Sequence, residues 1–339
     1  MRAVADASSF GFDLGALDGY LRRALDLSGP MRIEPIGGGQ SNPTFFVDYD
    51  DRALVLRKQP PGELLPSAHA IDREYRVIRA LRDTPVPVPP ALLYCDDRPI
   101  VGTPFYVMEK VEGRVFHDCT LPGLPASERT AMYAALAETL AALHNVDAAA
   151  AGLADYGKPG NYFARQITRW GRQWELSGNR ADPHIERLRA WLPAHIPLDE
   201  TSSIVHGDYR IGNVMFHPSE PRIVAVLDWE LSTLGHPLAD LAHCAIAWQS
   251  APDEYGGLAG LALDTLGIPS LERFAGFYAG RARHGVALQP FHLAFALFRW
   301  AAIFEGIAAR AKAGNASAGN AADTGQLASA FAKRAAQLT

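Results

Sequence analysis

Apolar and polar residues follow one period in the first third of the chain and another beyond it, and the change falls near residue 110. Up to that point, short apolar runs are bounded by Gly, Pro or Asp, a pattern that is typical of β-strands. A helix is predicted where Ile71, Tyr75, Ile78 and Leu81 recur at helical spacing, and an opening helix is expected over residues 14–27. The predicted strands cover residues 32–36, 44–49, 53–58, 91–95 and 105–110.

Beyond residue 112 the apolar positions predict a mostly helical region. Ser127 precedes an Ala- and Leu-rich run and is expected to cap its helix. A strand-like island over residues 203–228 interrupts the helices, and the Ala-, Gly- and Asn-rich segment 311–325 is interpreted as a loosely ordered connection. Further helices are expected over residues 162–176, 184–192, 237–249, 270–283, 290–311 and 325–337. The predicted fold class is α+β, with a small antiparallel-sheet lobe over residues 1–110 and a larger, mostly helical lobe over residues 111–339.

Composition narrows the classes of protein that fit this pattern. The 339 residues are 48% hydrophobic and 20% charged, enough for one large domain or for two lobes around sizeable cores. With 32 Lys and Arg against 37 Asp and Glu, the formal net charge is −5, so a nucleic-acid partner is not expected. Cys95, Cys119 and Cys244 are odd in number and form no CxxC pair, which argues against a disulfide framework and favours a reducing compartment.

Two segments bear on the location of the protein. Residues 1–13 carry charges and lack the apolar run of a secretory signal. Residues 291–309 are the most membrane-like stretch, but they contain His292, Arg299 and Glu305, so a buried helix is expected there. We therefore expect a cytoplasmic protein without a membrane partner.

The segment with the clearest chemistry is IVHGDYRIGNVMF (204–216), followed by RIVAVLDWE (222–230). Asp208 and Asn213 fall on an expected loop between strand-like runs, and Asp228 ends the next apolar run. Phosphoryl transfer needs a carboxylate that orients a hydroxyl and accepts its proton, and hard oxygen ligands that hold Mg²⁺ against the nucleotide phosphates. Asp208 suits the first role, and Asn213 with Asp228 suits the second.

This pattern, H-G-D-x-x-x-x-N with Asp-Trp-Glu fifteen residues after the Asn, resembles the aminoglycoside phosphotransferases and choline-kinase-like small-molecule kinases. The likeness covers residues 30–310, and the nearest subgroup is the kinase-like domain associated with acyl-CoA dehydrogenases. It implies a protein-kinase-like bilobal fold, ATP and Mg²⁺ as cofactors, and a small-molecule hydroxyl as acceptor. It also implies that His206 and Asp240, the latter within GHPLADLAH (235–243), brace the catalytic loop. An acyl-CoA dehydrogenase of the same pathway is an expected partner.

The small lobe is expected to hold the nucleotide. Its Gly-rich turn, GGGQSNP (37–43), would bring backbone N–H groups close to phosphate oxygens, although a tight hairpin explains the glycines equally well. The turn is neither a dinucleotide fingerprint nor a P-loop, because no helix and no Gly-Lys-Ser/Thr follow it. The expected phosphate-binding residues are Gly38, Gly39, Gln40, Ser41 and Asn42.

The same resemblance assigns the remaining nucleotide contacts. The phosphate-binding cation falls at Arg57, where many relatives have Lys, and the neighbouring Lys58 stays an alternative. Glu74 lies within the apolar stripe of its helix, where a carboxylate needs a partner, and the strand cation supplies one. Adenine is expected to bind backbone groups near Glu109 and Val111, with Met108 lining its pocket.

The acceptor is the least determined part of the hypothesis. Arg165, Arg169 and Arg172 share one side of a predicted helix and suit a hydroxy acid or hydroxyacyl-CoA better than a polycationic aminoglycoside. An aminoglycoside-type antibiotic kinase, a nucleotide-binding pseudokinase and a protein kinase stay open as alternatives. A hydrolase-type metal site formed by His206, Asp208 and His217 is a further alternative.

Overall fold

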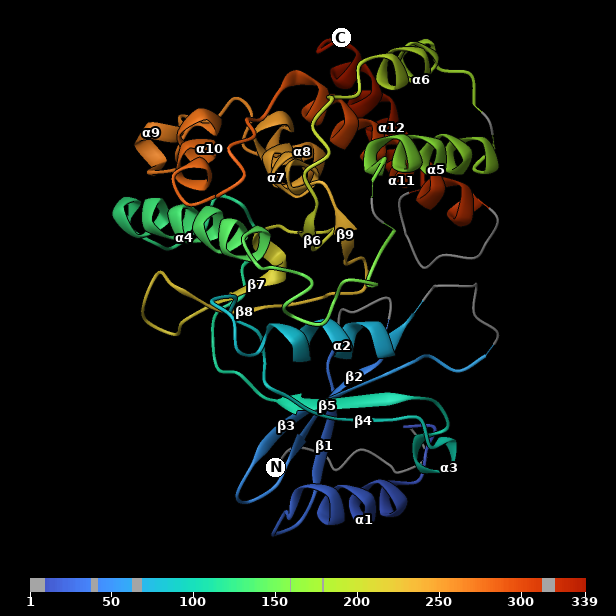
Figure 1. Ribbon diagram of the computed structural model, residues 1–339, viewed down its shortest axis with the longest axis vertical. Helices are drawn as coiled ribbons and strands as arrows, with labels where there is room; N and C mark the ends of the chain where they lie inside the picture. Colours follow the sequence, from blue (N-terminus) through green and yellow to red (C-terminus); the bar gives the residue numbers. More distant parts are fainter. Residues whose placement is uncertain (1–9, 38–41, 63–68, 159, 179, 313–320) are drawn as a thin grey trace. The chain divides into compact units, whose positions relative to one another are not determined.

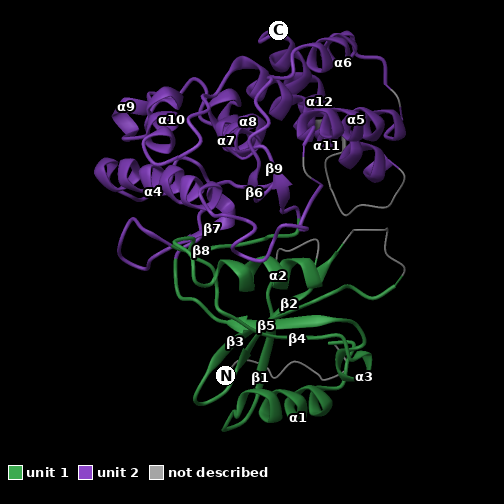
Figure 2. Cartoon of the chain, viewed as in Figure 1, with its two compact units in different colours: residues 1–113, 224–230 green, residues 114–223, 231–339 purple. Residues whose placement is uncertain are grey.

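The computed structural model describes residues 10–37, 42–62, 69–158, 160–178, 180–312 and 321–339. The chain forms two compact units, shown in separate colours in Figure 2. Unit 1 comprises Met1–Gly113 and Val224–Glu230, and unit 2 comprises Arg114–Ile223 and Leu231–Thr339.

Unit 1 contains a five-stranded antiparallel sheet in the order β1-β2-β3-β5-β4. Alternation along its strands gives the sheet two apolar faces. Leu54 and Leu56 of β3 join Leu17 and Leu21 of α1 in one core, whereas helix α2 covers the opposite face (Figure 1). The strands are β1 (Arg32–Pro35), β2 (Thr44–Asp48), β3 (Ala53–Lys58), β4 (Ala91–Cys95) and β5 (Phe105–Glu109), and the helices are α1 (Leu14–Leu25), α2 (Ile71–Leu81) and α3 (Arg98–Val101).

Unit 2 is mostly helical, with a small antiparallel pair formed by β6 and β9. Its helices are α4 (Ala126–His144), α5 (Tyr162–Leu176), α6 (Pro183–Ala194), α7 (Pro237–Ala245), α8 (Pro252–Tyr255), α9 (Leu263–Leu266), α10 (Leu271–Ala279), α11 (Pro290–Lys312) and α12 (Ala321–Ala336). Short 3₁₀ turns occur at η2 (Ile211–Asn213) and η3 (Ile246–Gln249). The remaining strands of unit 2 are β6 (Ser203–Val205), β7 (Val214–Phe216) and β9 (Thr233–Gly235), while β8 (Ile223–Val226) belongs to unit 1 from Val224 onward.

Helix α11 runs through the core of unit 2. It packs against α5, α6, α7 and α12, and its phenylalanines belong to one buried apolar cluster. Its length and mean hydropathy of 1.3 would suit a membrane span, but 83% of its most apolar 18-residue stretch is buried inside the protein. Burial by neighbouring helices is what a core helix of a folded domain requires, as the sequence indicated for residues 291–309.

Several predictions about local structure were wrong. Ser127 is not the cap of α4, because the helix already begins at Ala126 and Pro125 holds the N-cap position without a side-chain acceptor. The segment 311–325 is not one loose connection: α11 runs to Lys312 and α12 begins at Ala321, while residues 313–320 lie outside the described residues. Helix α3 and strand β9 were not predicted, because elements of three or four residues show no measurable period.

The predicted division of the chain also needs one correction. Segment 228–230 was placed in the helical lobe, but Val224–Glu230 groups with unit 1. The Val226 N–H donates to the Pro87 carbonyl at 2.8 Å, and the Asp228 carboxylate pairs with Arg57. The segment therefore belongs to unit 1, where Asp228 completes a polar cluster around Arg57.

Candidate active site

The polar cluster of unit 1 is centred on Arg57 of β3. Its Nε donates to Glu74 Oε2 at 2.7 Å and its Nη2 to Asp228 Oδ1 at 2.9 Å, while Nη1 lies 3.3 Å from Thr44 Oγ1. The guanidinium thus donates to the two carboxylates through separate nitrogens, which its planar fork allows. The helical position of Glu74 indicated that it needs a partner and the family resemblance implied Arg57, and the structure contains this ion pair.

Glu74 is the most deeply buried carboxylate of this cluster, with 1% of its surface exposed. Asn42 Nδ2 donates to it at 2.5 Å and the Tyr106 hydroxyl at 3.3 Å, in addition to Arg57. Burial raises the pKa of Glu74 even though Arg57 pulls it down. Burial alone would lower the pKa of Arg57, but the neighbouring Glu74, Tyr106 and Asp228 raise it, so the guanidinium stays charged.

Lys58, the alternative cation, faces the other side of β3. Its Nζ donates to the Val101 carbonyl at 2.6 Å and lies 4.8 Å from the centre of the Phe12 ring. Burial lowers the pKa of this ammonium group. Because successive side chains of a strand point to opposite faces, only Arg57 reaches the face that carries Glu74 and Asp228.

The backbone at Asp228 has a left-handed conformation that L-residues rarely adopt. Its φ is +63°, and its side chain is 37% exposed. Next to it, Trp229 is buried, and its indole N–H donates to the Val226 carbonyl at 3.0 Å. Non-glycine residues held at positive φ cluster at functional sites, where the surrounding structure compensates the strain. Asp228 therefore lies in a strained backbone position between the β8 strand and a buried tryptophan.

Of the phosphate-binding residues predicted in the Gly-rich turn, the structure describes Asn42. Gly38, Gly39, Gln40 and Ser41 lie outside the described residues. Asn42 is buried, with Nδ2 on Glu74 and Oδ1 3.0 Å from His69 Nδ1, so its side chain braces the Arg57–Glu74 pair.

The predicted adenine-binding strand end is formed by β5. Met108 and Glu109 belong to β5, and Val111 follows it. The Glu109 N–H donates to the Pro90 carbonyl at 2.9 Å, and its carboxylate accepts from Arg52 at 2.7 Å. An adenine contact at Glu109 would therefore fall to its carbonyl oxygen.

Unit 2 holds Asp208 by groups that differ from those around Glu74. Asn213 Nδ2 donates to Asp208 Oδ2 at 2.7 Å and to its backbone carbonyl at 2.8 Å. His243 Nε2 lies 2.9 Å from Oδ1, and Arg210 Nε lies 3.5 Å from Oδ2. Burial would raise the pKa of Asp208, but the hydrogen bond from His243 and the nearby Arg210 lower it well below its ordinary value. The carboxylate therefore stays ionised and able to accept a proton.

The loop that carries Asp208 is held by buried polar contacts. Asp240 accepts the N–H of His206 at 2.6 Å and of Gly207 at 2.9 Å, and Arg299 Nη2 donates to the Gly207 carbonyl at 2.6 Å. His206 Nδ1 accepts the Asp208 N–H at 3.2 Å. Gly207 has a φ of +85°, and a Cβ there would lie 2.6 Å from the Leu231 carbonyl oxygen, so the position requires glycine.

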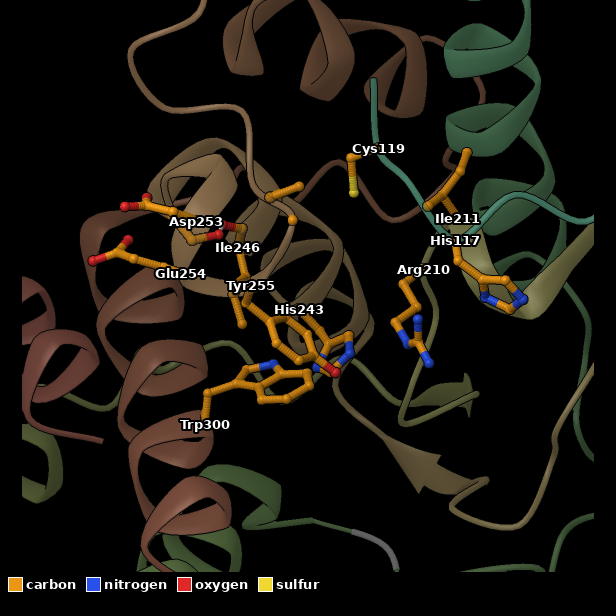
Figure 3. A pocket seen from close by; sticks show the side chains of 13 residues that line it. His117, Cys119, Arg210, Ile211, His243, Ile246, Asp253, Glu254, Tyr255 and Trp300 are labelled. Carbon is orange, nitrogen blue, oxygen red and sulfur yellow. Dashed lines mark hydrogen bonds between the residues drawn. The ribbon is translucent and has the colours of Figure 1, made fainter. Parts of the chain in front are cut away.

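A cavity of about 470 Å³ opens beside this loop within unit 2. Arg210 and His243, which both contact Asp208, line it, and Trp300 and Tyr255 form an aromatic wall with their rings 4.7 Å apart (Figure 3). The Arg210 guanidinium packs over Gly212, where a Cβ would approach Nη1 to 2.5 Å. The lining consists of His117, Cys119, Arg210, Ile211, His243, Ile246, Ala247, Ser250, Asp253, Glu254, Tyr255, Gly256 and Trp300.

The arginines that the sequence suggested for the acceptor do not line this cavity. Arg165 donates to the carbonyls of Gly160 and Lys158 and so braces the start of α5. Arg169 lies over the Trp170 ring at 5.2 Å, and Arg172 is exposed. A helical face shared by three arginines is a local pattern, and it carries no information about where a cavity forms.

The residues that sequence reasoning missed are Arg210, His243 and Arg299. His243 follows Asp240 by three residues on α7, so both side chains lie on one side of that helix. That spacing was a signal, because Asp240 was already expected to face the catalytic loop. Arg299 gave no comparable signal, since it lies in α11, more than eighty residues from the loop it contacts.

The donor atoms suit a hard cation better than a zinc-type site. Among the described residues, no group of three or more His, Cys, Asp or Glu gathers around a point that could hold a metal ion. His217 is paired with Glu220 at 3.6 Å, and His206 serves the loop backbone. Asn213 donates its amide nitrogen to Asp208, and one carboxylate oxygen of Asp228 accepts from Arg57. Amide and carboxylate oxygens are ligands that Mg²⁺ accepts.

Comparison with known proteins agrees with this geometry. A family model described as the phosphotransferase enzyme family, APH, matches residues 32–277, which is more than half of the chain. The chain belongs to this family. The fold is the protein-kinase-like fold of the aminoglycoside phosphotransferases, with the five-stranded antiparallel sheet and the helical unit described above.

Three similar proteins place the chain within the phosphotransferase family. Acyl-CoA dehydrogenase family member 10 of Mus musculus is 42% identical over 330 residues, covering 94% of this chain and 30% of that protein. The chain thus spans less than a third of the length of this relative. A crystal structure from Ralstonia eutropha, provisionally named an aminoglycoside phosphotransferase, has 44% identity and a TM-score of 0.89, covering 96% of this chain and 98% of that one. APH(4)-Ia in complex with AMP-PNP and hygromycin B shares the fold, with 17% identity and a TM-score of 0.61, covering 95% and 98%.

Proposed function

We propose that this phosphotransferase moves the γ-phosphoryl group of ATP to a hydroxyl of a small molecule. The observation that carries the proposal is the state of Asp208, a mostly buried carboxylate that stays ionised on a braced loop beside a cavity. A general base must reach the hydroxyl that it deprotonates and must be unprotonated beforehand. The same family includes a protein solved with the ATP analogue AMP-PNP, which supports ATP as the donor.

In the proposed reaction, Asp208 accepts the proton of the acceptor hydroxyl as its oxygen bonds to the γ-phosphorus. The bond between that phosphorus and the bridging oxygen breaks, and ADP leaves. Asn213 and Asp228 would hold Mg²⁺, which when bound neutralises charge on the phosphates. Arg57, oriented by Glu74, would bind phosphate oxygens together with the 38–42 turn. The β5 end at Met108, Glu109 and Val111 would bind adenine.

We propose that the acceptor binds in the cavity beside Asp208 and that it is a hydroxy acid or a hydroxyacyl-CoA. The aromatic wall of Trp300 and Tyr255 suits an apolar body, and Arg210 with His117 suits an anionic group. Of the two acidic lining residues, Glu254 is already paired with Arg334 at 2.8 Å. A polycationic aminoglycoside would need several unpaired carboxylates. The relative named as an acyl-CoA dehydrogenase supports an acyl acceptor and, as partner, an acyl-CoA dehydrogenase acting in the same pathway. The proposed location is the cytoplasm, as the sequence led us to expect.

ADP release from Mg-ATP tests the proposal, with a panel of hydroxy acids, hydroxyacyl-CoAs, choline-like amines and aminoglycosides. Asp208→Asn should lower turnover by about a thousandfold or more while ATP affinity changes little, because the variant keeps the side-chain shape but loses the base. Release with an acidic acceptor, absent in the variant, supports the full proposal. Release with an aminoglycoside alone overturns the acceptor class and keeps the mechanism. ATP binding without turnover of any acceptor indicates a pseudokinase.

A further inference from the structure

His243 contacts the proposed base, although it lies outside the motif that carries Asp208. Its Nε2 is 2.9 Å from Asp208 Oδ1, and its side chain is 2% exposed. The residue sits on α7, three positions after Asp240, whose carboxylate binds the backbone of the catalytic loop. One helix therefore holds the loop at its backbone and also reaches the carboxylate that the loop presents.

The protonation state of His243 follows from its surroundings. Burial lowers the pKa of the ring, so the imidazole is neutral near pH 7. An ionised carboxylate can only accept a hydrogen bond, so the single ring proton must lie on Nε2. Within the described part of the chain, Nδ1 has no hydrogen-bond partner, which agrees with this tautomer. His243 is thus a neutral donor toward Asp208.

The orientation of the ring is fixed from the other side by Trp300. The two rings stack, with centroids 5.4 Å apart and planes inclined by 28°. Trp300 in turn packs against Phe304 at 5.2 Å within α11. A neutral ring clamped in this way donates in one direction only, and it loses little conformational entropy when the hydrogen bond forms.

We propose that His243 is a positioning residue that fixes the rotation of the Asp208 carboxylate. The terminal torsion of an aspartate side chain is broad, so one contact does not set it. Here Oδ1 accepts from His243 and Oδ2 accepts from Asn213, and these two donors on different oxygens define the plane of the group. The remaining lone pairs then point in fixed directions toward the acceptor hydroxyl. His243 takes no proton in the reaction, because Asp208 itself receives it. This inference rests on the proposed function.

Two substitutions separate positioning from general support of the fold. His243→Leu keeps a similar volume and removes the donor, whereas His243→Gln keeps an N–H near the position of Nε2. We expect kcat of the leucine variant to fall by about 10- to 100-fold, in line with the effect of small misplacements of catalytic groups. The KM for ATP should change by less than about 2-fold, since no nucleotide contact is touched. The glutamine variant should recover most of the lost rate.

The matched control is His292→Leu. His292 is equally buried and also stacks, against His236 with centroids 5.6 Å apart, but it does not contact Asp208. This variant should lose a comparable amount of stability and keep its kcat. An unchanged kcat in His243→Leu would overturn the positioning role. So would an equal fall in kcat in His243→Leu and His243→Gln if both variants unfold at the same urea midpoint.

A double-mutant cycle on stability keeps this inference testable if no acceptor is phosphorylated. Urea unfolding of Asp208→Ala, His243→Leu and the double variant needs neither ATP nor acceptor. We expect the midpoint shift of the double variant to be smaller than the sum of the single shifts, because both substitutions remove one shared hydrogen bond. Additive shifts would overturn the contact. Coupled residues in a protein without kinase activity would overturn the proposed function and leave the contact standing.

Discussion

The two units hold their buried carboxylates in opposite ways. In unit 1, Glu74 is neutralised mainly by the full charge of Arg57 at 2.7 Å, and burial still raises its pKa. In unit 2, Asp208 accepts hydrogen bonds from His243 and Asn213, with Arg210 farther away at 3.5 Å. His243 and Arg210 lower its pKa despite burial. Burial outweighs the charge of Arg57 at the more enclosed Glu74, whereas the donors around the more exposed Asp208 outweigh its burial, so the two pKa shifts have opposite directions.

This difference matches the work that each carboxylate is proposed to do. Glu74 is 1% exposed and surrounded by donors, so a substrate cannot reach its carboxylate oxygens. Asp208 is 23% exposed on its side chain, beside residues that line a cavity. A carboxylate that orients a cation can be enclosed, whereas a base must present a lone pair. The comparison predicts that substitutions in unit 1 affect stability and ATP binding, and that those around Asp208 affect turnover.

The largest expected effect is on stability. Glu74→Ala removes the main partner of the buried Arg57 and should lower the free energy of unfolding by roughly 3 kcal/mol, the lower end for a broken buried ion pair, because Asp228 remains. Asp208→Ala removes the acceptor of His243 and Asn213 and a longer, partly exposed pair with Arg210, and it should cost about 1 to 2 kcal/mol. Urea denaturation at pH 7.5 measures both.

The control for this comparison is Glu272→Ala, an exposed carboxylate on α10. It should change the free energy of unfolding by less than about 0.5 kcal/mol. A greater loss in Asp208→Ala than in Glu74→Ala would contradict the contrast between charge pairing in unit 1 and hydrogen bonding in unit 2.

A second experiment sharpens the role of the fork in unit 1. Arg57→Lys keeps a positive charge but cannot bind Glu74 and Asp228 with separate, fixed nitrogens. We expect the KM for ATP to rise by about tenfold, and the free energy of unfolding to fall by about 1 kcal/mol. The control is Arg32→Lys on β1, where the exposed arginine pairs with Asp50. It should change neither the KM for ATP nor the free energy of unfolding. Equal KM values for Arg57→Lys and wild type would show that charge alone suffices at this position.

Sequence reasoning succeeded where the decisive information was local. The strands and the α2 helix follow from apolar periodicity, and the position of Glu74 in an apolar stripe identified a need for a buried cation. The alternation along β3 separated Arg57 from Lys58 by face, and the structure then placed Lys58 against Val101. The spacing of Asp208, Asn213 and Asp228 indicated the chemistry because a loop motif carries its residues at fixed distances. Their roles stay predictions until they are measured.

The rest depended on contacts between distant segments. His243 and Arg299 reach the loop that carries Asp208 from α7 and α11, and periodicity shows only that those helices have buried faces. The three arginines of α5 were selected by a shared helical face, yet Arg165 is occupied by carbonyls of the preceding turn. A helical pattern states which residues share a side, and only packing determines whether a cavity, another helix or solvent lies on that side.

The smallest expected effect tests the opposite pKa shifts directly. The pKa of Asp208 lies below its ordinary 3.8. At acid pH the unfolded chain therefore binds a proton at this carboxylate that the folded chain does not bind, and the free energy of unfolding decreases as the pH is lowered. The pKa of Glu74 lies above its ordinary 4.5, so as pH falls from neutral the folded chain binds that proton first, and this contribution to stability rises. Asp208→Asn should therefore make the acid loss of stability shallower below about pH 4, whereas Glu74→Gln should make it steeper above about pH 4.5.

Urea unfolding at a series of pH values from neutral to acid provides the measurement. Each difference from wild type is bounded by about 1.4 kcal/mol per pH unit, the slope for one proton. Glu272→Gln is the matched control at an exposed position on α10. If Glu74→Gln and Asp208→Asn changed the slope in the same direction, the two carboxylates would share one electrostatic environment. In that case the ion pair with Arg57 would outweigh the burial of Glu74, and the two carboxylates would differ only in their access to the cavity.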